Sequence, residues 1–311
     1  MKTIKWVIAH EPIDLFLRAA NRFAKDINGK TEQFDLQIMT LNEYASRYND
    51  GIPMDKNDLL KHMEDGRVQM SQMFTTTLGK EHNRDMWALD MPFLFRDHDH
   101  AKRVFEGEVG KKLLNDLKGN IKGLAFTYSG GFRMLPSDRD VYTVEDLKGM
   151  RIRVHEQSPI SAETFNAVGA TPVPLTLEEI NEGAEKGLID GGESTYPRYY
   201  ALSQNEALPV INDTKHSLFL TSILVNRDFW SELSENDQEV IQASALVAAE
   251  TERHESIDDI ARVVSLCERE GINVNHLSEE ETSKFKKATD YLYEKFEPMF
   301  TGGMLQAIRA A

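Results

Sequence analysis

The chain has 311 residues, of which 41% are hydrophobic and 28% are charged, and its formal net charge is −15. This length predicts two domains rather than one compact core. The acidic charge excludes nucleic acid as a partner, because such a chain repels a phosphate backbone.

The sequence contains no segment that is expected to enter a membrane. No stretch approaches the roughly 20 apolar residues of a membrane span. A secretory signal is not evident either, because a strand-like run over residues 4–9 follows Met1 almost at once. Two interpretations therefore stay open: a cytoplasmic protein, or a mature form with an added start methionine. Cys267 is the only cysteine, which excludes an intrachain disulfide and a Cys-based zinc site and favours an inert, half-buried thiol.

The first part of the chain alternates short strands with amphipathic helices. Apolar residues at helical spacing predict a helix that ends at Gly29 and another that Gly66 stops. Strands are predicted over residues 4–9, 34–39 and 68–74. This β-α-β-α-β order predicts a mainly parallel sheet with helices on both faces.

A second β-α-β region begins near Gly123. It is preceded by an apolar turn over residues 91–95 and by a helix that Asp97 caps and Gly107 ends. Strands are then predicted over 124–128 and 150–154, with a helix over 162–168 that Gly169 ends.

Residues 234–270 contain neither glycine nor proline and predict one long helix. Ser234 and Asp237 resemble a capping pair at its start. At 1.5 Å per residue the helix would be roughly 55 Å long, which exceeds a domain diameter. We therefore expect it to run along both domains.

Two arginines border apolar strands in the most informative stretch, residues 129–154. Arg133 follows a Gly-Gly turn, and Arg153 lies in the second strand. Because an arginine is costly to bury unpaired, each must meet an anion or solvent. A guanidinium matches a carboxylate with two parallel hydrogen bonds, which favours a carboxylate clamp. The alternative is surface salt bridges with nearby aspartates such as Asp146, and the residues alone leave both open.

Several motifs follow one another along nearly the whole chain. They are residues 90–97 (DMPFLFRD), 131–133 (GFR), 146–154 (DLKGMRIRV), 168–174 (VGATPVP), 187–191 (GLIDG), 216–217 (HS) and 229–233 (FWSEL). In this order they resemble the substrate-binding component of TRAP transporters, the tripartite ATP-independent periplasmic transporters. The long uninterrupted helix is also a mark of that family.

The resemblance implies an α/β, two-domain periplasmic-binding-protein fold (type II-like), with the long helix spanning both domains. The two domains are expected to close on a ligand like a hinged clamp. The expected first domain holds residues 1–123 plus about 212–250, and the second holds 124–211 plus about 251–311, with the ligand cleft between them.

The resemblance also implies the anchor of the site. Arg153 is expected to make the main salt bridge to a ligand carboxylate, with Arg133 close by. Arg151 stays outside the expected site, because the family usually has a solvent-facing lysine there. After the DG turn the family commonly has Glu-Asn, whose amide hydrogen-bonds the ligand, whereas this chain has Glu193 and Ser194. Ser194 can donate one hydrogen bond but lacks the reach and second donor of asparagine, which leaves the ligand class open.

Other candidates for the pocket come from loops and helix starts. His10 and Glu11 follow the first predicted strand, and Phe74 and Thr75 follow a later one, where loops would face the cleft. Their hydroxyl and aromatic groups suit a short or polyhydroxylated acid. The last candidates are His216, expected to border the pocket from the hinge-crossing region, and Tyr196, which either lines the pocket or packs at a helix start.

The resemblance implies an extracytoplasmic receptor that binds a small organic carboxylate and delivers it to integral membrane TRAP subunits. We expect a periplasmic monomer without cofactor, metal or catalysis. A sugar acid, such as a uronate or aldonate, and a C4-dicarboxylate both remain as ligands. An enzyme on the same fold would need a nucleophile or acid–base pair in the cleft, and a cytoplasmic ligand-sensing domain would normally carry a helix-turn-helix. Neither feature is evident. His98 and His100 do not predict a metal site, because helix residues two apart do not face each other.

Overall fold

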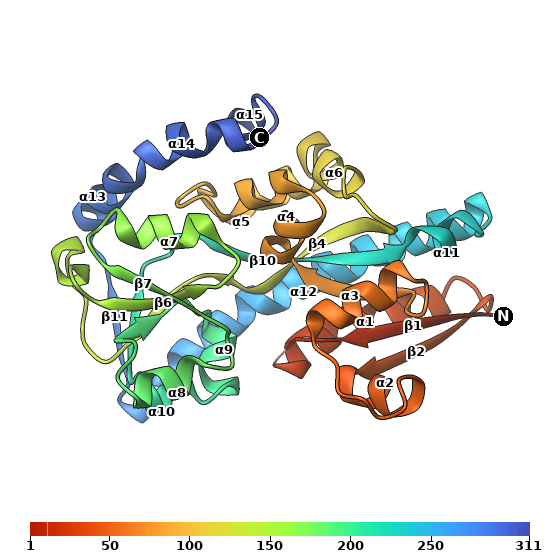
Figure 1. Cartoon of the computed structure of the whole chain (residues 1–311), viewed down its shortest axis with the longest axis horizontal. Helices are drawn as coiled ribbons and strands as arrows, with labels where there is room; N and C mark the ends of the chain where they lie inside the picture. The colour runs from red at the N-terminus through yellow and green to blue at the C-terminus, as the bar shows by residue number, and fades with distance from the viewer. Residues whose placement is uncertain (11) are drawn as a thin grey trace. The chain divides into compact units, whose positions relative to one another are not determined.

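The computed structural model describes residues 1–10 and 12–311 (Figure 1). These residues form two compact units, each with its own sheet. Unit 1 contains Met1–Asn83, Gly110–Ser129 and Leu220–Glu255, and unit 2 contains Arg84–Val109, Gly130–Phe219 and Ser256–Ala311.

Unit 1 is built on a five-stranded sheet with the strand order β2-β1-β3-β10-β4. Its strands are β1 (Lys2–Ile8), β2 (Phe34–Thr40), β3 (Met70–Phe74), β4 (Ile121–Phe132) and β10 (Leu218–Asn226). β1 runs parallel to β2 and β3, whereas β10 is antiparallel to β3. The parallel part follows from the predicted alternation, because parallel neighbours need a crossover connection.

The helices of unit 1 follow its strands along the chain. They are α1 (Ile13–Asn28), α2 (Leu41–Tyr48), α3 (Lys56–Glu64), α4 (Thr75–Glu81), most of α6 (Glu108–Asn115) and α11 (Arg227–Ser231). In α1, Phe23 is fully buried, and its ring centroid lies 5.2 Å from that of Trp6 in β1. α2 was not predicted from the apolar pattern, although Thr40 and Glu43 form a capping box at its start.

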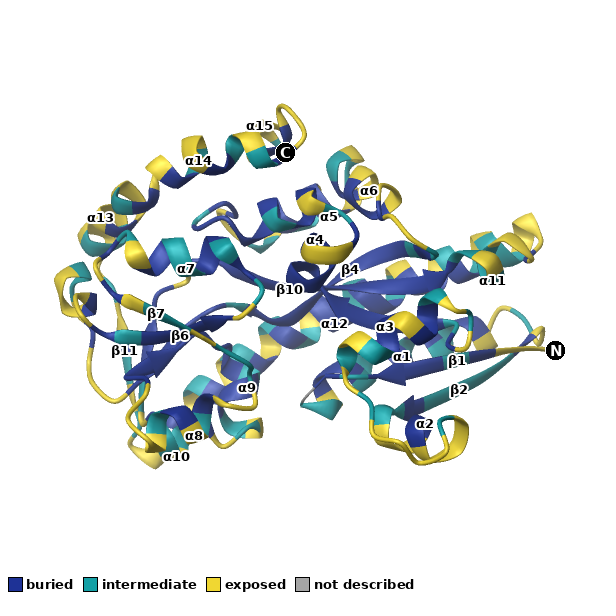
Figure 2. Cartoon of the chain, viewed as in Figure 1, coloured by how far each residue is buried: buried dark blue, intermediate teal, exposed yellow. Residues whose placement is uncertain are grey.

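Unit 2 has a six-stranded sheet with the order β11-β9-β5-β8-β6-β7. Its strands are β5 (Leu135–Ser137), β6 (Arg151–His155), β7 (Thr171–Leu175), β8 (Gly191–Gly192), β9 (Val210–Asp213) and β11 (Asn273–His276). β7 ends the sheet, which fits its two prolines, since proline lacks the N–H that a central strand donates. Ile152 and Val154 of β6 pack in a core with Phe165 and Phe285, and Figure 2 shows this strand as buried.

The helical segments of unit 2 surround this sheet and its core. They are η1 (Arg84–Asp90), α5 (His98–Glu106), η2 (Val144–Leu147), α7 (Pro159–Asn166), α8 (Ile180–Glu185), α9 (Tyr196–Ala201), α10 (Gln204–Ala207), α13 (Glu279–Thr289), α14 (Tyr291–Phe296), η3 (Glu297–Met299) and α15 (Met304–Ala310). α5 begins after Asp97, whose side chain accepts a hydrogen bond from the His100 amide, and ends at Gly107 as predicted.

The predicted long helix is α12 (Glu235–Glu270), an unbroken helix of 36 residues. The Ser234 hydroxyl accepts a hydrogen bond from the Asp237 amide at 3.2 Å, which confirms the predicted capping pair. Residues 235–255 of the helix belong to unit 1 and 256–270 to unit 2. Cys267 near its end is fully buried, and burial raises the pKa of its thiol. Nowhere in the described chain does a helix combine the length and apolar character needed to cross a bilayer.

The predicted domain limits differ from the two units at several segments. Residues 84–109 and 212–219 were expected in the first domain but lie in unit 2, and residues 124–129 were expected in the second domain but lie in unit 1. The segment 84–109 is the longest of these. Side-chain contacts with the C-terminal segment explain its position. The Asp85 carboxylate accepts a hydrogen bond from the Thr301 amide, and His100 contacts the carbonyl oxygen of Ile308 at 2.8 Å.

Candidate functional site

Arg153 lies in β6 and is almost completely buried, with 1% of its surface exposed. In the sheet it pairs with Val173 of β7 and Gly192 of β8. A Cβ atom at Gly192 would stand 3.2 Å from the Cβ of Arg153, so the glycine gives the arginine room. The Nε of Arg153 donates a hydrogen bond to the carbonyl oxygen of Leu175 at 2.8 Å. The sheet therefore fixes one edge of this guanidinium.

The guanidinium of Arg153 keeps its positive charge at neutral pH. Burial lowers its pKa to about 10, and the Glu193 carboxylate offsets part of that effect. Among the described residues, no hydrogen-bond acceptor meets its Nη1 or Nη2. A buried cation with two unfilled nitrogens is costly unless an anion binds it. The outer edge of Arg153 is thus suited to a carboxylate.

Arg133 directly follows β4 and is 2% exposed. Its backbone amide donates a hydrogen bond to the carbonyl oxygen of Ser217 at 2.9 Å. Its guanidinium carbon lies 3.9 Å from the centroid of the Phe219 ring, a cation–π distance. Its Nη1 lies 3.4 Å from Oε2 of Glu193, and both side chains are buried. Arg133 is thus already paired with a carboxylate of the protein itself.

Gly130 and Gly131 lie near the end of β4 rather than in the predicted turn, with φ values of 91° and 88°. A Cβ atom at Gly130 would lie 2.3 Å from Oγ1 and 2.8 Å from Cβ of Thr195. We therefore expect Gly130→Ala to lower the free energy of unfolding by ~2–4 kcal/mol, from backbone strain and overpacking together.

The matched control is Gly187→Ala. Gly187 also has a positive φ, 64°, but nothing lies within 4 Å of the point that a Cβ atom would occupy there. Strain alone is expected to cost ~1 kcal/mol at this position. Urea unfolding measures both variants, and equal losses would contradict the close approach at Gly130.

Glu193 follows β8 and is 1% exposed. Its Oε1 accepts hydrogen bonds from His216 Nε2 at 3.1 Å and from Ser161 Oγ at 3.4 Å. Burial alone would raise the pKa of this carboxyl group, but Arg133, His216 and Arg153 together outweigh burial and lower it to about 2. Glu193 is therefore an ionised carboxylate between the two arginines.

His216 is held on every side by residues of unit 2. Its Nδ1 lies 2.7 Å from the Thr214 hydroxyl, and its backbone carbonyl accepts a hydrogen bond from the Phe93 amide at 2.7 Å. The ring is stacked with Phe285 and meets Phe165 edge-on. The predicted border residue therefore contacts Glu193 and positions that carboxylate.

Ser194 and Tyr196 follow Glu193 in the chain but have different surroundings. Ser194 forms an antiparallel bridge with Met134 through two backbone hydrogen bonds of 2.9 and 3.0 Å. Its hydroxyl is buried and has no hydrogen-bond partner among the described residues. Tyr196 begins α9 and packs in an apolar cluster with residues such as Tyr199 and Cys267. Its surroundings match the packing alternative, and burial raises the pKa of its hydroxyl.

The candidates from the first part of the chain lie together in unit 1. His10 follows β1, and Phe74 is the last residue of β3, the parallel neighbour of β1. The ring centroids of His10 and Phe74 are 4.0 Å apart. The Thr75 hydroxyl donates a hydrogen bond to the carbonyl oxygen of Leu220 at 3.3 Å. All three side chains are buried. Glu11 lies outside the described residues.

Arg151, which the sequence analysis leaves out of the site, is tied to Asp190. Its backbone amide and its Nε donate hydrogen bonds to Oδ2 of Asp190 at 2.7 and 3.1 Å. These hydrogen bonds and the positive charge of Arg151 outweigh burial and lower the pKa of the Asp190 carboxyl group. Arg151 is 43% exposed, so its charge faces water rather than an enclosed site.

The structure adds residues that the sequence analysis did not assign to the site. The Phe219 ring lies beneath Arg133 and also 5.0 Å from the guanidinium carbon of Arg198, which is fully buried. Ser161 donates to Glu193 from α7. Phe219 lies in an apolar strand, and Ser161 in the first turn of a helix, so neither pattern distinguishes them from ordinary core residues.

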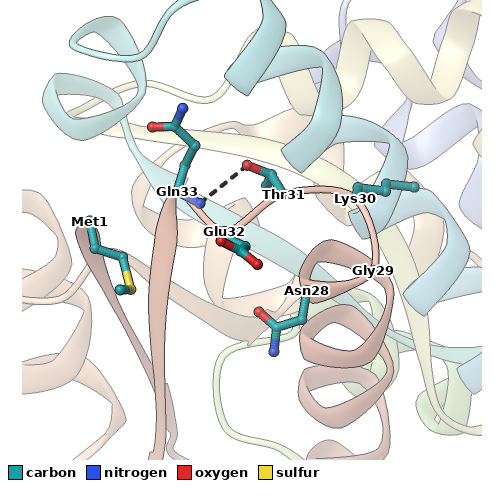
Figure 3. A pocket seen from close by; sticks show the side chains of 7 residues that line it. All are labelled: Met1, Asn28, Gly29, Lys30, Thr31, Glu32 and Gln33. Atoms are coloured by element: carbon teal, nitrogen blue, oxygen red, sulfur yellow. Dashed lines mark hydrogen bonds between the residues drawn. The ribbon is translucent and has the colours of Figure 1, made fainter.

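A separate hollow lies on unit 1, and its lining includes none of the predicted site residues (Figure 3). It is lined by Met1, Asn28, Gly29, Lys30, Thr31, Glu32 and Gln33. These residues are exposed or half-buried, and the Gln33 amide donates a hydrogen bond to the Thr31 hydroxyl at 3.2 Å. An open surface of this kind does not enclose a ligand.

Two α/β units share one long helix, and unit 2 contains a buried guanidinium whose Nη1 and Nη2 are free, among the described residues, to donate to an anion. Residues 9–298 match the family described as "Bacterial extracellular solute-binding protein, family 7". The chain belongs to this family, as the motif order predicted. Both the α/β class and the long helix agree with that assignment.

Known proteins show the same relationship. The C4-dicarboxylate-binding protein DctB of Bacillus subtilis is 24% identical over 91% of this chain and 78% of its own length. The 2,3-diketo-L-gulonate-binding periplasmic protein YiaO of Escherichia coli is 30% identical over 60% of this chain. That match spans 57% of the length of YiaO. A separate match, with a solute-binding protein from Roseobacter denitrificans, spans 66% of that protein, so the chain covers less than two thirds of both relatives. A solved TRAP periplasmic solute-binding protein from Ochrobactrum anthropi superimposes with a TM-score of 0.88 at 25% identity, covering 99% of this chain and 94% of that one.

Proposed function

We propose that this protein is the periplasmic solute receptor of a TRAP transporter and that it binds a small organic carboxylate through Arg153. The observation that carries the proposal is the buried guanidinium, 1% exposed, whose Nη1 and Nη2 meet no acceptor in the described chain. A carboxylate fills that edge with two charge-assisted hydrogen bonds. Family membership supports the receptor role, and the ligands named for DctB and YiaO are both organic acids.

The other residues of the cluster position the anchor or add single contacts. Glu193 and His216 hold Arg133 against Phe219, which keeps a rigid wall beside the ligand. The Ser194 hydroxyl, which has no hydrogen-bond partner in the described chain, supplies one donor. The proposed role is capture and release, with no bond made or broken in the ligand.

Residues of unit 1 form a second group of candidate ligand contacts. His10, Phe74 and Thr75 are the candidates, because they lie together where two parallel strands of their own sheet end.

A thermal-shift screen against organic acids tests this function. The protein is first unfolded and refolded, which removes any ligand carried from the expression host. An acid at about 100 times its Kd stabilises the folded state by about 2.7 kcal/mol, so one family of carboxylates is expected to raise the Tm by roughly 5 °C or more. If no carboxylate raises the Tm while an uncharged sugar or a cation does, the proposal is wrong.

A further inference from the structure

Three buried ionisable side chains of unit 2 set the charge of the proposed site. Arg133 and Arg153 are cations, Glu193 is an anion, and all three are 1–2% exposed. The two positive charges and one negative charge leave a single uncompensated positive charge. We infer that the site selects acids that carry one carboxylate over dicarboxylates of the same skeleton. This inference rests on the proposed function and specifies its substrate class.

The charge of Arg133 is already used within the protein. Its Nη1 lies 3.4 Å from Oε2 of Glu193, and the Phe219 ring covers its face. Glu193 is held in place by His216 and Ser161, so it cannot swing away without breaking two further hydrogen bonds. Arg133 can still donate from Nε, which has no hydrogen-bond partner in the described chain. It therefore offers a ligand a donor without a net charge.

Both ring nitrogens of His216 already have partners within unit 2. Its Nε2 faces the Glu193 carboxylate, and its Nδ1 faces the Thr214 hydroxyl. Neither ring nitrogen is therefore left to contact a ligand.

The other buried arginines of the described chain have contacts of their own. The buried arginines are Arg133, Arg153, Arg198 and Arg253, and no lysine is buried among the described residues. Arg198 lies over Phe219 and Arg253 donates to the carbonyl oxygen of Phe126, and each has further interactions of its own. The unit 1 candidates His10, Phe74 and Thr75 carry no permanent charge.

Exposed acidic residues near Arg153 also disfavour a second ligand carboxylate. Glu156 and Glu178 lower the positive potential at Arg153, although both face solvent and are screened. A second ionised carboxylate buried beside this cluster would lose its hydration and gain no cation. Ligand hydroxyls meet no such penalty, because Ser194 and Thr75 present hydroxyl groups of their own. A hydroxylated monocarboxylate fits both the charge and the polar groups.

Matched pairs of acids test the inference in the wild-type protein. The pairs are D-gluconate with D-glucarate, D-galactonate with galactarate, and 4-hydroxybutanoate with succinate. They are titrated calorimetrically near pH 8, where both carboxyl groups of each diacid are ionised. In the pair that binds most tightly, the monoacid is expected to bind at least about 10-fold more tightly than its diacid. Equal or tighter binding of the diacid would overturn the inference.

A variant that lacks the Glu193 charge tests whether this charge causes the preference for monoacids. Glu193→Gln removes the negative charge that neutralises Arg133, so the preference for the monoacid is expected to shrink by about 10-fold or more. Glu178→Gln removes the same charge at an exposed position, where solvent screens it, and is expected to change the ratio by no more than about 2-fold. An unchanged ratio in a folded Glu193→Gln protein would contradict the charge argument. If that variant does not fold, the wild-type pairs decide.

The same titrations distinguish a failure of the charge inference from a failure of the proposed receptor function. Tight binding of diacids alone would overturn the charge inference and leave the receptor function standing. Loss of binding for every acid, together with the absence of any shift in the wider thermal screen, would remove the proposed function and the inference with it. Preference for monoacids supports both.

Discussion

Replacing Arg153 with methionine is expected to lower the affinity for the ligand acid by roughly 30- to 4000-fold, which corresponds to about 2–5 kcal/mol. The variant removes the buried guanidinium whose Nη1 and Nη2 meet no acceptor in the described residues. Methionine keeps an unbranched apolar stem in the space of the arginine. Because a desolvated cation is removed, the variant is expected to fold. Calorimetric titration with the acid found in the screen measures the loss.

Arg151→Met is the matched control, because it removes the same charge from the same strand. Arg151 is 43% exposed and paired with Asp190, so solvent screens its charge. Its loss is expected to change the affinity by no more than a few-fold. A large effect at Arg151 and none at Arg153 would show that the wrong arginine has been assigned as the anchor.

Glu193→Gln is expected to lower the free energy of unfolding by ~3–5 kcal/mol near pH 7. The substitution leaves Arg133 buried without its carboxylate partner, which lies 3.4 Å away in the native protein. Glu178→Gln, at an exposed position, is expected to change stability by no more than about 0.5 kcal/mol. Urea unfolding monitored by tryptophan fluorescence measures both.

The difference in the free energy of unfolding between wild type and Glu193→Gln is expected to decrease as the pH falls. The pKa of Glu193 falls from 4.5 to about 2 on folding, so the folded state favours the ionised form. Its contribution to stability is present above pH 4.5 and is lost as the pH falls toward about 2. The gap between the two proteins should therefore shrink by ~3 kcal/mol across that range. A gap that stays constant would mean that Glu193 is not ionised in the folded protein.

The elements of the fold follow from local patterns. The helix predicted over 234–270 is observed as Glu235–Glu270, because a long run without glycine or proline has no reason to stop. The strand predicted over 150–154 is observed as Arg151–His155. Helix ends are less well predicted: the helix expected over 162–168 begins earlier, at Pro159, after the Ser158 hydroxyl caps the Ser161 amide. A proline in the first turn marks such a start, and the apolar pattern does not contain that signal.

The pairing inside the site could not be predicted from sequence. Strand alternation places Arg151 and Arg153 on one face, yet only Arg153 is buried, because Arg151 stands at the start of the strand, where it meets Asp190. The ion pair of Arg133 with Glu193 joins two segments that only the tertiary fold brings together. Family resemblance indicated the arginines, whereas their charge state depends on burial and on neighbours that no local motif records.

The most direct test of the central claim is a crystal structure of the protein with the acid that gives the largest thermal shift. The account predicts that a ligand carboxylate lies in the plane of the Arg153 guanidinium, within hydrogen-bond distance of Nη1 and Nη2, while Nε keeps its bond to Leu175. It also predicts that Glu193 stays paired with Arg133. A ligand whose carboxylate contacts neither nitrogen of Arg153 would contradict the account.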